Sequence, residues 1–209
     1  MRRTVGHMGE GLKYDAIVLA GGRSRRMVGR NKVSLPIGGK PLVVSAVEAV
    51  SGAERICLVG PRAPLDEALG PDWDPRWVQT QEEPAFGGPV AGIVAGLNAL
   101  RGGSAPLVAV LACDLPEAPG AIEHLLARID ELTEDALCAL APDGYTQWLL
   151  GFYRREFLER RAQEIPGRDL SVRRFMAPAR VSTVPVAARL LQDLDSPQDV
   201  AEYLAAGKD

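Results

Sequence analysis

A glycine- and arginine-rich segment, residues 19–32, follows the strand-like run 14–19 and has the composition of a phosphate-binding loop. It contains the adjacent glycines Gly21 and Gly22 and ends in Lys32. Its arginines are Arg23, Arg25, Arg26 and Arg30. Glycines let backbone N–H groups approach a phosphate chain, and clustered cationic side chains balance several phosphate oxygens. We expect a nucleoside triphosphate site here; the alternative is a solvated basic loop, which the preceding strand and the paired glycines disfavour.

Two better-known phosphate loops do not fit this segment. The order Gly-x-x-x-x-Gly-Lys-Ser/Thr is absent, because Pro41 follows Gly39 and Lys40. No Gly-x-Gly-x-x-Gly follows the first strand either. The sequence therefore excludes a P-loop and a dinucleotide-binding fingerprint at this position.

Three aspartates are candidate metal ligands. Asp114 ends an apolar strand-like run and is followed by Leu-Pro, which predicts a carboxylate at the mouth of a sheet, where it can bind Mg²⁺. Asp193 and Asp195 flank Leu194, and in an extended segment alternation puts both carboxylates on one face. Either one could complete a Mg²⁺ site with Asp114. The alternatives are that Asp114 caps the helix expected near Pro119, or that Asp195 caps the last helix.

A second loop, residues 81–92, is rich in glycine and carries Glu82 and Glu83. A carboxylate beside such a loop can accept hydrogen bonds from a base or a ribose hydroxyl, although the same composition occurs in plain turns. Two further patches have open assignments. The first is a polar-aromatic patch formed by Thr146, Gln147 and Trp148. It either faces a flat ligand or, as the simpler interpretation, contains a packed and partly buried Trp148. The second is a positive patch formed by Arg168, Arg173 and Arg174. It either holds the phosphate of an acceptor or is a solvated helix face.

The composition limits the class of protein. The chain has 209 residues, 46% hydrophobic and 24% charged, which is ordinary for one globular α/β domain. A net charge of −3 argues against a general nucleic-acid binder. The cysteines Cys57, Cys113 and Cys138 lie far apart in apolar stretches, so we expect buried reduced thiols. No secretory signal or membrane span is evident, and we expect a cytoplasmic protein.

Strand-like runs alternate with helical patterns, which predicts a single-domain, three-layer α/β/α fold with a mostly parallel sheet. We expect a polar extension at 1–13 and one domain at 14–209. The expected strands are 15–19, 55–59, 76–79, 106–113, 136–140, 148–153 and 181–184. The expected helices are 41–51, 92–100, 120–132, 155–164 and 197–205. Ligands of such sheets bind beyond the carboxyl ends of the strands, where both the glycine-rich loop and Asp114 are expected.

From Tyr14 to Leu204 the chain resembles the molybdenum cofactor guanylyltransferases of the nucleotide-diphosphosugar transferase-like superfamily. Six blocks carry the resemblance: Leu19–Lys32, Pro36–Leu42, Gly88–Gly92, Cys113–Pro116, Val172–Met176 and Asp193–Val200. The chain departs from the family pattern at four places. Val28 is an extra residue, Val59 stands where the family has Asn, Glu83 replaces Asp, and the closing block has Asp193 and Asp195 where Asn is common.

The resemblance implies a Rossmann-like nucleotidyltransferase that transfers GMP from GTP to the terminal phosphate of molybdopterin and releases pyrophosphate, with Mg²⁺ as cofactor. The nucleotide-binding residues that it implies are Leu19, Ala20, Gly21, Gly22, Lys32, Glu83 and Asp114. In the mechanism that we expect, Lys32, Asp114 and Arg25 or Arg26 are catalytic, and Asp114 and Asp195 are the metal ligands.

The same resemblance makes molybdenum-insertion and molybdoenzyme-maturation proteins candidate partners; we expect neither nucleic acid nor a membrane. Two alternatives stay open. One is transfer of a cytidylyl group, or transfer to a sugar or alditol phosphate, with the same loop. The other is a non-catalytic carrier of nucleotide or cofactor, which would release no pyrophosphate.

Overall fold

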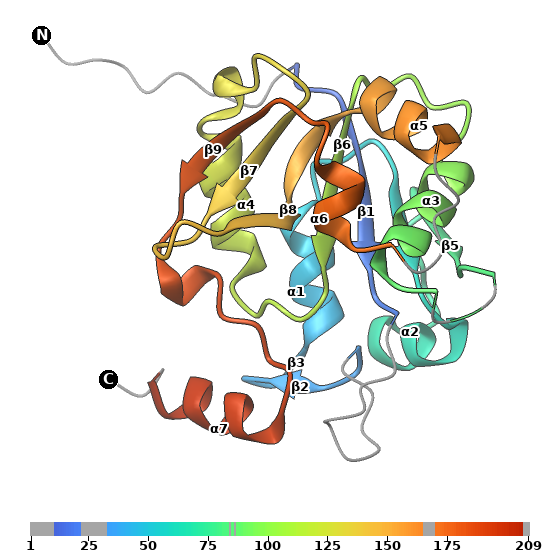
Figure 1. Ribbon diagram of the computed structural model, residues 1–209. Coiled ribbons are helices and arrows are strands. Elements are labelled where there is room, and N and C mark those ends of the chain that lie inside the picture. Colours follow the sequence, from blue (N-terminus) through green and yellow to red (C-terminus); the bar gives the residue numbers. More distant parts are fainter. Residues whose placement is uncertain (1–10, 22–32, 84, 86, 165–169, 207–209) are drawn as a thin grey trace, which may run out of the picture.

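The computed structural model describes residues 11–21, 33–83, 85, 87–164 and 170–206 (Figure 1). Five of the residues assigned a role above lie outside these ranges: Gly22, Arg25, Arg26, Lys32 and Arg168. Among the described residues, no helix is both long enough and apolar enough to cross a membrane.

The centre of the molecule is a seven-stranded sheet with the order β5-β4-β1-β6-β8-β7-β9. Neighbouring strands are parallel except at β8, which is antiparallel to both β6 and β7. The mostly parallel sheet predicted from the sequence is therefore confirmed. The strands are β1 Tyr14–Leu19, β4 Ile56–Val59, β5 Trp77–Thr80, β6 Leu107–Ala112, β7 Ala136–Leu140, β8 Thr146–Arg154 and β9 Val181–Pro185.

Helices cover both faces of the sheet and complete three layers (Figure 1). On one face α1 and α4 pack against one apolar cluster, and on the other α3, α5 and α6 pack against a second. The buried side chains of β1 alternate between the two clusters: Ala16 and Val18 belong to the first, Ile17 and Leu19 to the second. The helices are α1 Leu42–Ala49, α2 Arg62–Leu69, α3 Pro89–Ala99, α4 Ala118–Leu126, α5 Arg155–Glu164, α6 Val172–Met176 and α7 Pro197–Ala206.

Three of these features were not predicted from the sequence. The stretch expected to be loop up to Gly39 contains a small hairpin, β2 (Pro36–Ile37) and β3 (Lys40–Pro41), which turns through Gly38 and Gly39 at positive φ. Helices α2 and α6 were also missed. Both are short, and α2 starts directly after Pro61, the residue that follows the expected strand 55–59 by two positions.

An ionic cluster lies at the amino end of β1, opposite the edge expected to bind ligand. The buried carboxylate of Asp15 accepts hydrogen bonds from Arg55 at 2.9 Å and from Arg155 at 2.6 Å. Arg155 also donates to the carbonyl oxygen of Ala105 at 2.7 Å. A side chain at Gly103 would meet Arg55, because a Cβ there would lie 1.9 Å from its Nη2 atom. The cluster joins β1, β4 and the start of α5.

Candidate active site

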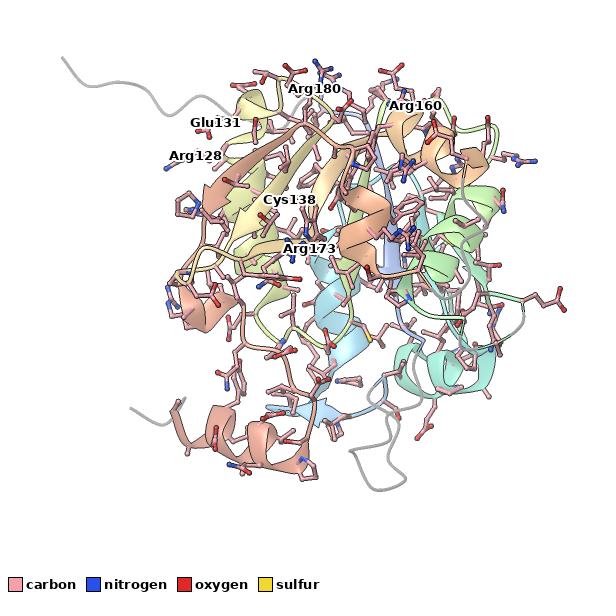
Figure 2. The ribbon with its side chains drawn as sticks, viewed as in Figure 1. Arg128, Glu131, Cys138, Arg160, Arg173 and Arg180 are labelled. Carbon is pink, nitrogen blue, oxygen red and sulfur yellow. The ribbon has the colours of Figure 1, made fainter. Side chains whose placement is uncertain are left out.

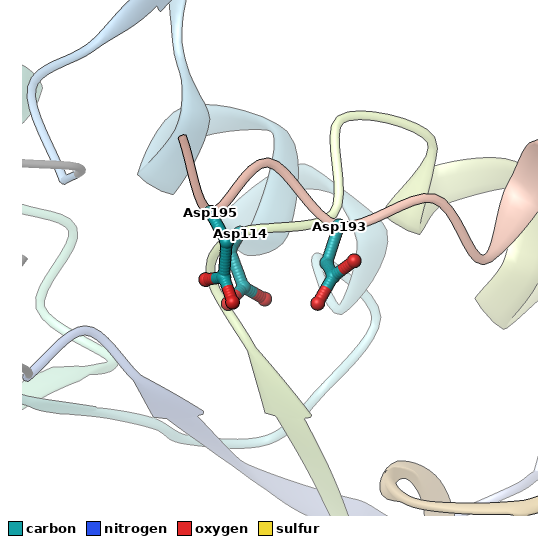
Figure 3. Close-up of side chains that lie close together, drawn as sticks. All are labelled: Asp114, Asp193 and Asp195. Atoms are coloured by element: carbon teal, nitrogen blue, oxygen red, sulfur yellow. The ribbon is translucent and has the colours of Figure 1, made fainter. Parts of the chain in front are cut away.

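Three carboxylates meet at the carboxyl edge of the sheet. Asp114 leaves β6, and Asp193 and Asp195 lie in the segment before α7; ligand oxygens of the three lie within 4.8 Å of one another. Figure 3 shows that the three side chains point in the same direction from two chain segments. Asp193 and Asp195 therefore share one face and lie close to Asp114, and a metal site at this group stays a prediction.

The residue between the two aspartates fixes this arrangement. Leu194 is fully buried in a small cluster with Leu35, Ile37 and Leu42. Its backbone N–H donates to the carbonyl oxygen of Asp114 at 3.0 Å. Because alternate side chains of an extended segment point to opposite faces, burial of Leu194 directs both neighbouring aspartates toward Asp114.

The capping alternatives are wrong. The hydroxyl oxygen of Ser196 accepts from the backbone N–H of Asp199 at 3.3 Å, as predicted for the start of α7. The Asp199 carboxylate in turn accepts from the N–H groups of Asp195 at 2.9 Å and Ser196 at 2.7 Å. The N-cap of α4 is Glu117, not Asp114. Neither Asp114 nor Asp195 is therefore the residue that starts a helix.

The donor set of this group fits a hard divalent cation. Carboxylate oxygens are the ligands that Mg²⁺ prefers, and Mg²⁺ usually combines one or two of them with water and substrate phosphates. Like charges this close repel one another, and a bound cation relieves that repulsion. The chemistry of the three aspartates is therefore suited to holding Mg²⁺ together with a phosphate chain.

A second part of the edge lies where β1 ends. The peptide unit between Leu19 and Ala20 is held from both sides. The N–H of Ala20 donates to the carbonyl oxygen of Val59 at 2.8 Å, and the carbonyl oxygen of Leu19 accepts from the N–H of Cys113 at 3.1 Å. The approach of β4 is so close that Gly60 has no room for a side chain, because a Cβ there would lie 2.6 Å from the carbonyl oxygen of Ala20. Leu19 and Ala20 thus belong to a fixed backbone segment that precedes the glycine-rich residues 22–32 in the chain.

The glycine at 92 has a similar role on the neighbouring helix. A Cβ at Gly92 would lie 3.0 Å from the Leu19 side chain and 3.5 Å from that of Val59. The first turn of α3 can therefore approach the ends of β1 and β4 closely. Sequence reasoning placed Gly92 in a motif but gave it no such packing role, and it did not single out Gly60.

Two adjacent glutamates near this backbone differ sharply in burial. Glu82 is 8% exposed, and a Cβ at Gly21 would lie 3.8 Å from each of its carboxylate oxygens. Glu83, which the family resemblance pointed to, is exposed. Gln81, Glu82, Glu83 and Ala85 line a hollow of about 660 Å³. Glu82 is therefore the carboxylate that faces the end of β1. The course of the backbone after β5 buries Glu82 and leaves Glu83 exposed.

The remaining candidate residues lie on two elements. Thr146, Gln147 and Trp148 begin β8 and are partly buried, and Trp148 packs against the second apolar cluster, as the simpler interpretation predicted. Arg173 and Arg174 are exposed on α6.

The cysteines offer no nucleophile at this edge. All three are buried and none forms a disulfide, as predicted. Burial raises the pKa of Cys57 and of Cys138 to about 12, so both remain neutral thiols.

A family model and several known proteins match this chain, and they agree on one family. A family model for the MobA-like NTP transferase domain matches residues 16–184. The chain is 35% identical over 131 residues to the molybdenum cofactor guanylyltransferase of Burkholderia lata, a match that spans 61% of this chain and 62% of that relative. It is 31% identical over 180 residues to that of Burkholderia cenocepacia, covering 83% of this chain and 85% of the relative.

The fold is shared with solved structures. Molybdopterin-guanine dinucleotide biosynthesis protein A from Archaeoglobus fulgidus superposes with a TM-score of 0.65 at 22% identity. The superposition covers 92% of this chain and 98% of that one. The single-domain α/β architecture therefore follows a known nucleotidyltransferase fold.

Proposed function

Because the chain belongs to the MobA-like NTP transferase domain family, we propose that it transfers GMP from GTP to the terminal phosphate of molybdopterin and releases pyrophosphate. The observation that carries the proposal is the group of three carboxylates at the sheet edge, next to the backbone that leads into the glycine-rich loop. A metal-binding group beside a phosphate-binding loop is what transfer of a nucleotidyl group requires.

In this proposal the nucleotide lies along the end of β1. The backbone of Leu19, Ala20 and Gly21 contacts the guanine nucleotide, and Lys32 and Gly22 of the following loop bind its phosphates. The fixed position of Ala20 between β4 and β6 supports this role, because a rigid backbone pays no ordering entropy when the ligand binds.

We assign the choice of base to Glu82, with Glu83 at the rim of the hollow. Guanine presents two adjacent donors, N1–H and the N2 amino group, which suit the two oxygens of a carboxylate. Cytosine presents one amino donor beside an acceptor nitrogen, which a carboxylate repels. The burial of Glu82 beside Gly21 therefore favours GTP over CTP.

Asp114, Asp195 and Asp193 would hold Mg²⁺, which when bound supplies positive charge to the phosphate oxygens. A terminal phosphate oxygen of molybdopterin attacks the α-phosphorus of GTP in line, and the bond from that phosphorus to the bridging oxygen of the β-phosphate breaks. Pyrophosphate leaves with the bonding electrons. Lys32 and Arg25 or Arg26 neutralise the charge that develops on the leaving group. No protein nucleophile is needed.

The carrier alternative explains less of the site. A protein that only binds and hands over a nucleotide does not need a group of three carboxylates suited to a metal ion. The cytidylyl alternative uses the same geometry and differs only in the base of the nucleotide. An experiment that compares GTP with CTP must therefore distinguish it from guanylyl transfer.

The test is to incubate the purified protein with Mg²⁺, molybdenum-loaded molybdopterin and one nucleoside triphosphate at a time. Pyrophosphate release and the product mass are measured. A guanine dinucleotide formed only with GTP is the expected result. Product with CTP alone would move the protein to the cytidylyl class, and no product with any nucleotide would refute the proposal.

Two variants test the residues. Asp114→Asn and Lys32→Ala should each lower turnover by roughly 10²–10³-fold, as is typical when one charge-stabilising group is removed. Asp130→Asn is the matched control, because Asp130 is an exposed aspartate on the turn after α4. Wild-type rates for Asp114→Asn and Lys32→Ala would contradict the mechanism.

A further inference from the structure

Strand β8 is irregular at the end that lies beside the candidate active site. Its later half pairs with β6 as far as Leu111 opposite Leu150. Against β7, Cys138 is opposite Gly151, but the next residue, Ala139, is opposite Gln147. Residues 148–150 therefore have no counterpart on β7, and β8 bends sharply near α6 (Figure 1). Bulges of this kind re-aim side chains and are common next to active sites.

A buried hydroxyl group fixes the bulge. Tyr153 is fully buried, and its hydroxyl donates to the carbonyl oxygen of Trp148 at 2.6 Å. The thiol of Cys138, labelled in Figure 2, donates to the same hydroxyl at 3.2 Å. Burial raises the pKa of Tyr153, so the hydroxyl keeps its proton and remains a donor. The strands are also tightly closed here, because a Cβ at Gly151 would lie 2.8 Å from the Cys138 sulfur.

The bulge places an aromatic ring at the ligand-binding edge. Trp148 lies beyond the last pair of β8 with β6, on the side where Asp114 leaves β6. It is partly buried and packs against the cluster that contains Phe175 of α6. Packing therefore holds the side chain, and the residue as a whole stays partly exposed.

The neighbouring helix adds positive charge on the same side. Helix α6 packs against β8. It carries exposed Arg173 and Arg174, and Figure 2 shows Arg173 beside the bend of β8. Guanidinium groups near a sheet edge attract ligands that carry phosphate.

We propose that Trp148 is the platform on which the flat ring system of the acceptor stacks, and that the Tyr153 hydroxyl is a positioning group that holds this platform. The inference rests on the proposed function, which supplies a fused heterocycle with a phosphate as acceptor. Indole rings stack well on such heterocycles, because both present a large polarizable face. The arginines of α6 draw the phosphate-bearing acceptor to this side, while the nucleotide occupies the end of β1.

The first experiment measures the KM for molybdopterin and the KM for GTP separately. Trp148→Ala should raise the KM for molybdopterin by roughly 5- to 150-fold, the range found when a stacking aromatic is removed. The KM for GTP should stay unchanged, and Trp148→Phe should recover most of the loss. Trp77→Ala is the matched control: Trp77 is partly buried at the start of the edge strand β5, at the amino end of the sheet. An unchanged KM for molybdopterin in an active, folded Trp148→Ala variant overturns the proposal.

A second measurement does not need turnover. The chain has three tryptophans, so titration with molybdopterin alone should quench part of the wild-type fluorescence and none of it in Trp148→Phe. Equal quenching in both proteins overturns the platform. If the wild type forms no dinucleotide yet shows Trp148-dependent quenching, the proposed reaction fails and the binding inference stands.

The positioning role has its own variant. Tyr153→Phe keeps the ring and removes only the hydroxyl, so it should raise the KM for molybdopterin by about tenfold, near the cost of one hydrogen bond, with the KM for GTP unchanged. Unchanged kinetics in Tyr153→Phe would remove the positioning role of the hydroxyl, whatever Trp148→Ala shows.

Discussion

Replacing Gly60 with alanine should disturb nucleotide binding without touching any side chain assigned to the site. A Cβ at Gly60 would lie 2.6 Å from the carbonyl oxygen and 2.8 Å from the carbonyl carbon of Ala20. Carbon and oxygen atoms in favourable contact lie about 3.3 Å apart, so the two backbones must separate by about 0.7 Å. Both atoms that clash belong to backbone, and no flexible side chain can move aside.

The displacement acts on the segment that we assign to the nucleotide. It strains the hydrogen bonds from Ala20 to Val59 at 2.8 Å and from Gly60 to Thr80 at 2.9 Å. Overpacking of this kind costs about 1–3 kcal/mol of unfolding free energy, or roughly 2–4 °C in Tm per kcal/mol for a domain of this size. A shift approaching 1 Å in a positioning element lowers catalytic efficiency by roughly 10²-fold.

The assay combines thermal unfolding with steady-state kinetics. Gly60→Ala should remain folded, with a higher KM for GTP and a smaller change in the KM for molybdopterin. Gly120→Ala is the control, because a Cβ there would meet only the end of the Leu190 side chain, at 3.3 Å. A Gly60→Ala variant with wild-type stability and wild-type KM for GTP would refute both the packing argument and the nucleotide position.

Three further predictions concern groups elsewhere in the fold. Glu82→Gln keeps the size of the side chain but replaces one acceptor oxygen with a donor. The ratio of kcat/KM for GTP to kcat/KM for CTP, measured by pyrophosphate release, should therefore fall by about tenfold or more. An unchanged ratio would place base selection at another residue. Asp15→Asn removes the buried counter-charge of Arg155, whose side chain is 11% exposed, and leaves it the more exposed carboxylate of Glu159 at 3.6 Å. The change should cost about 3–5 kcal/mol in urea unfolding. A loss below 1 kcal/mol, roughly the worth of a surface ion pair, would show the cluster to be dispensable. The pKa values of Cys57 and Cys138 are raised to about 12, so at pH values near the ordinary thiol pKa of about 8.5 very little of either residue is thiolate. Both should therefore react with a thiol reagent only after the protein unfolds. Rapid labelling of either cysteine in the native protein, mapped by mass spectrometry, would contradict this.

The fold could be predicted from the sequence because its strands and most of its helices are strongly patterned. The strand at 136–140 and the helix at 155–164 were placed to the residue, since apolar runs and helical spacing are local signals. Helix α6 and the β2–β3 hairpin were missed because each is only a few residues long and is stabilised by packing against distant elements.

The candidate site was predicted unevenly for the same reason. Alternation around Leu194 was enough to orient Asp193 and Asp195, but only the buried cluster with Leu35, Ile37 and Leu42 brings that segment to Asp114. Whether Glu82 or Glu83 faces the end of β1 depends on how the backbone turns after β5. Two identical adjacent residues give no local signal for this turn. The close approach of Gly60 to Ala20 joins two strands far apart in sequence and has no local signature.

The two sides of the site are built by different physical means, and this should separate the effects of their variants. Around β1 and β4 the proposed nucleotide side is defined by backbone contact, with glycines at the points of closest approach. Around β8 the proposed acceptor side is defined by a side chain, the indole ring that the Tyr153 hydroxyl holds in place. Distant, independent sites act additively. Gly60→Ala and Trp148→Ala should therefore raise different KM values, and the double variant should show the product of the two single effects on kcat/KM. A loss much smaller or larger than that product would mean that nucleotide and acceptor share one element, and the division of the edge proposed for this chain would be wrong.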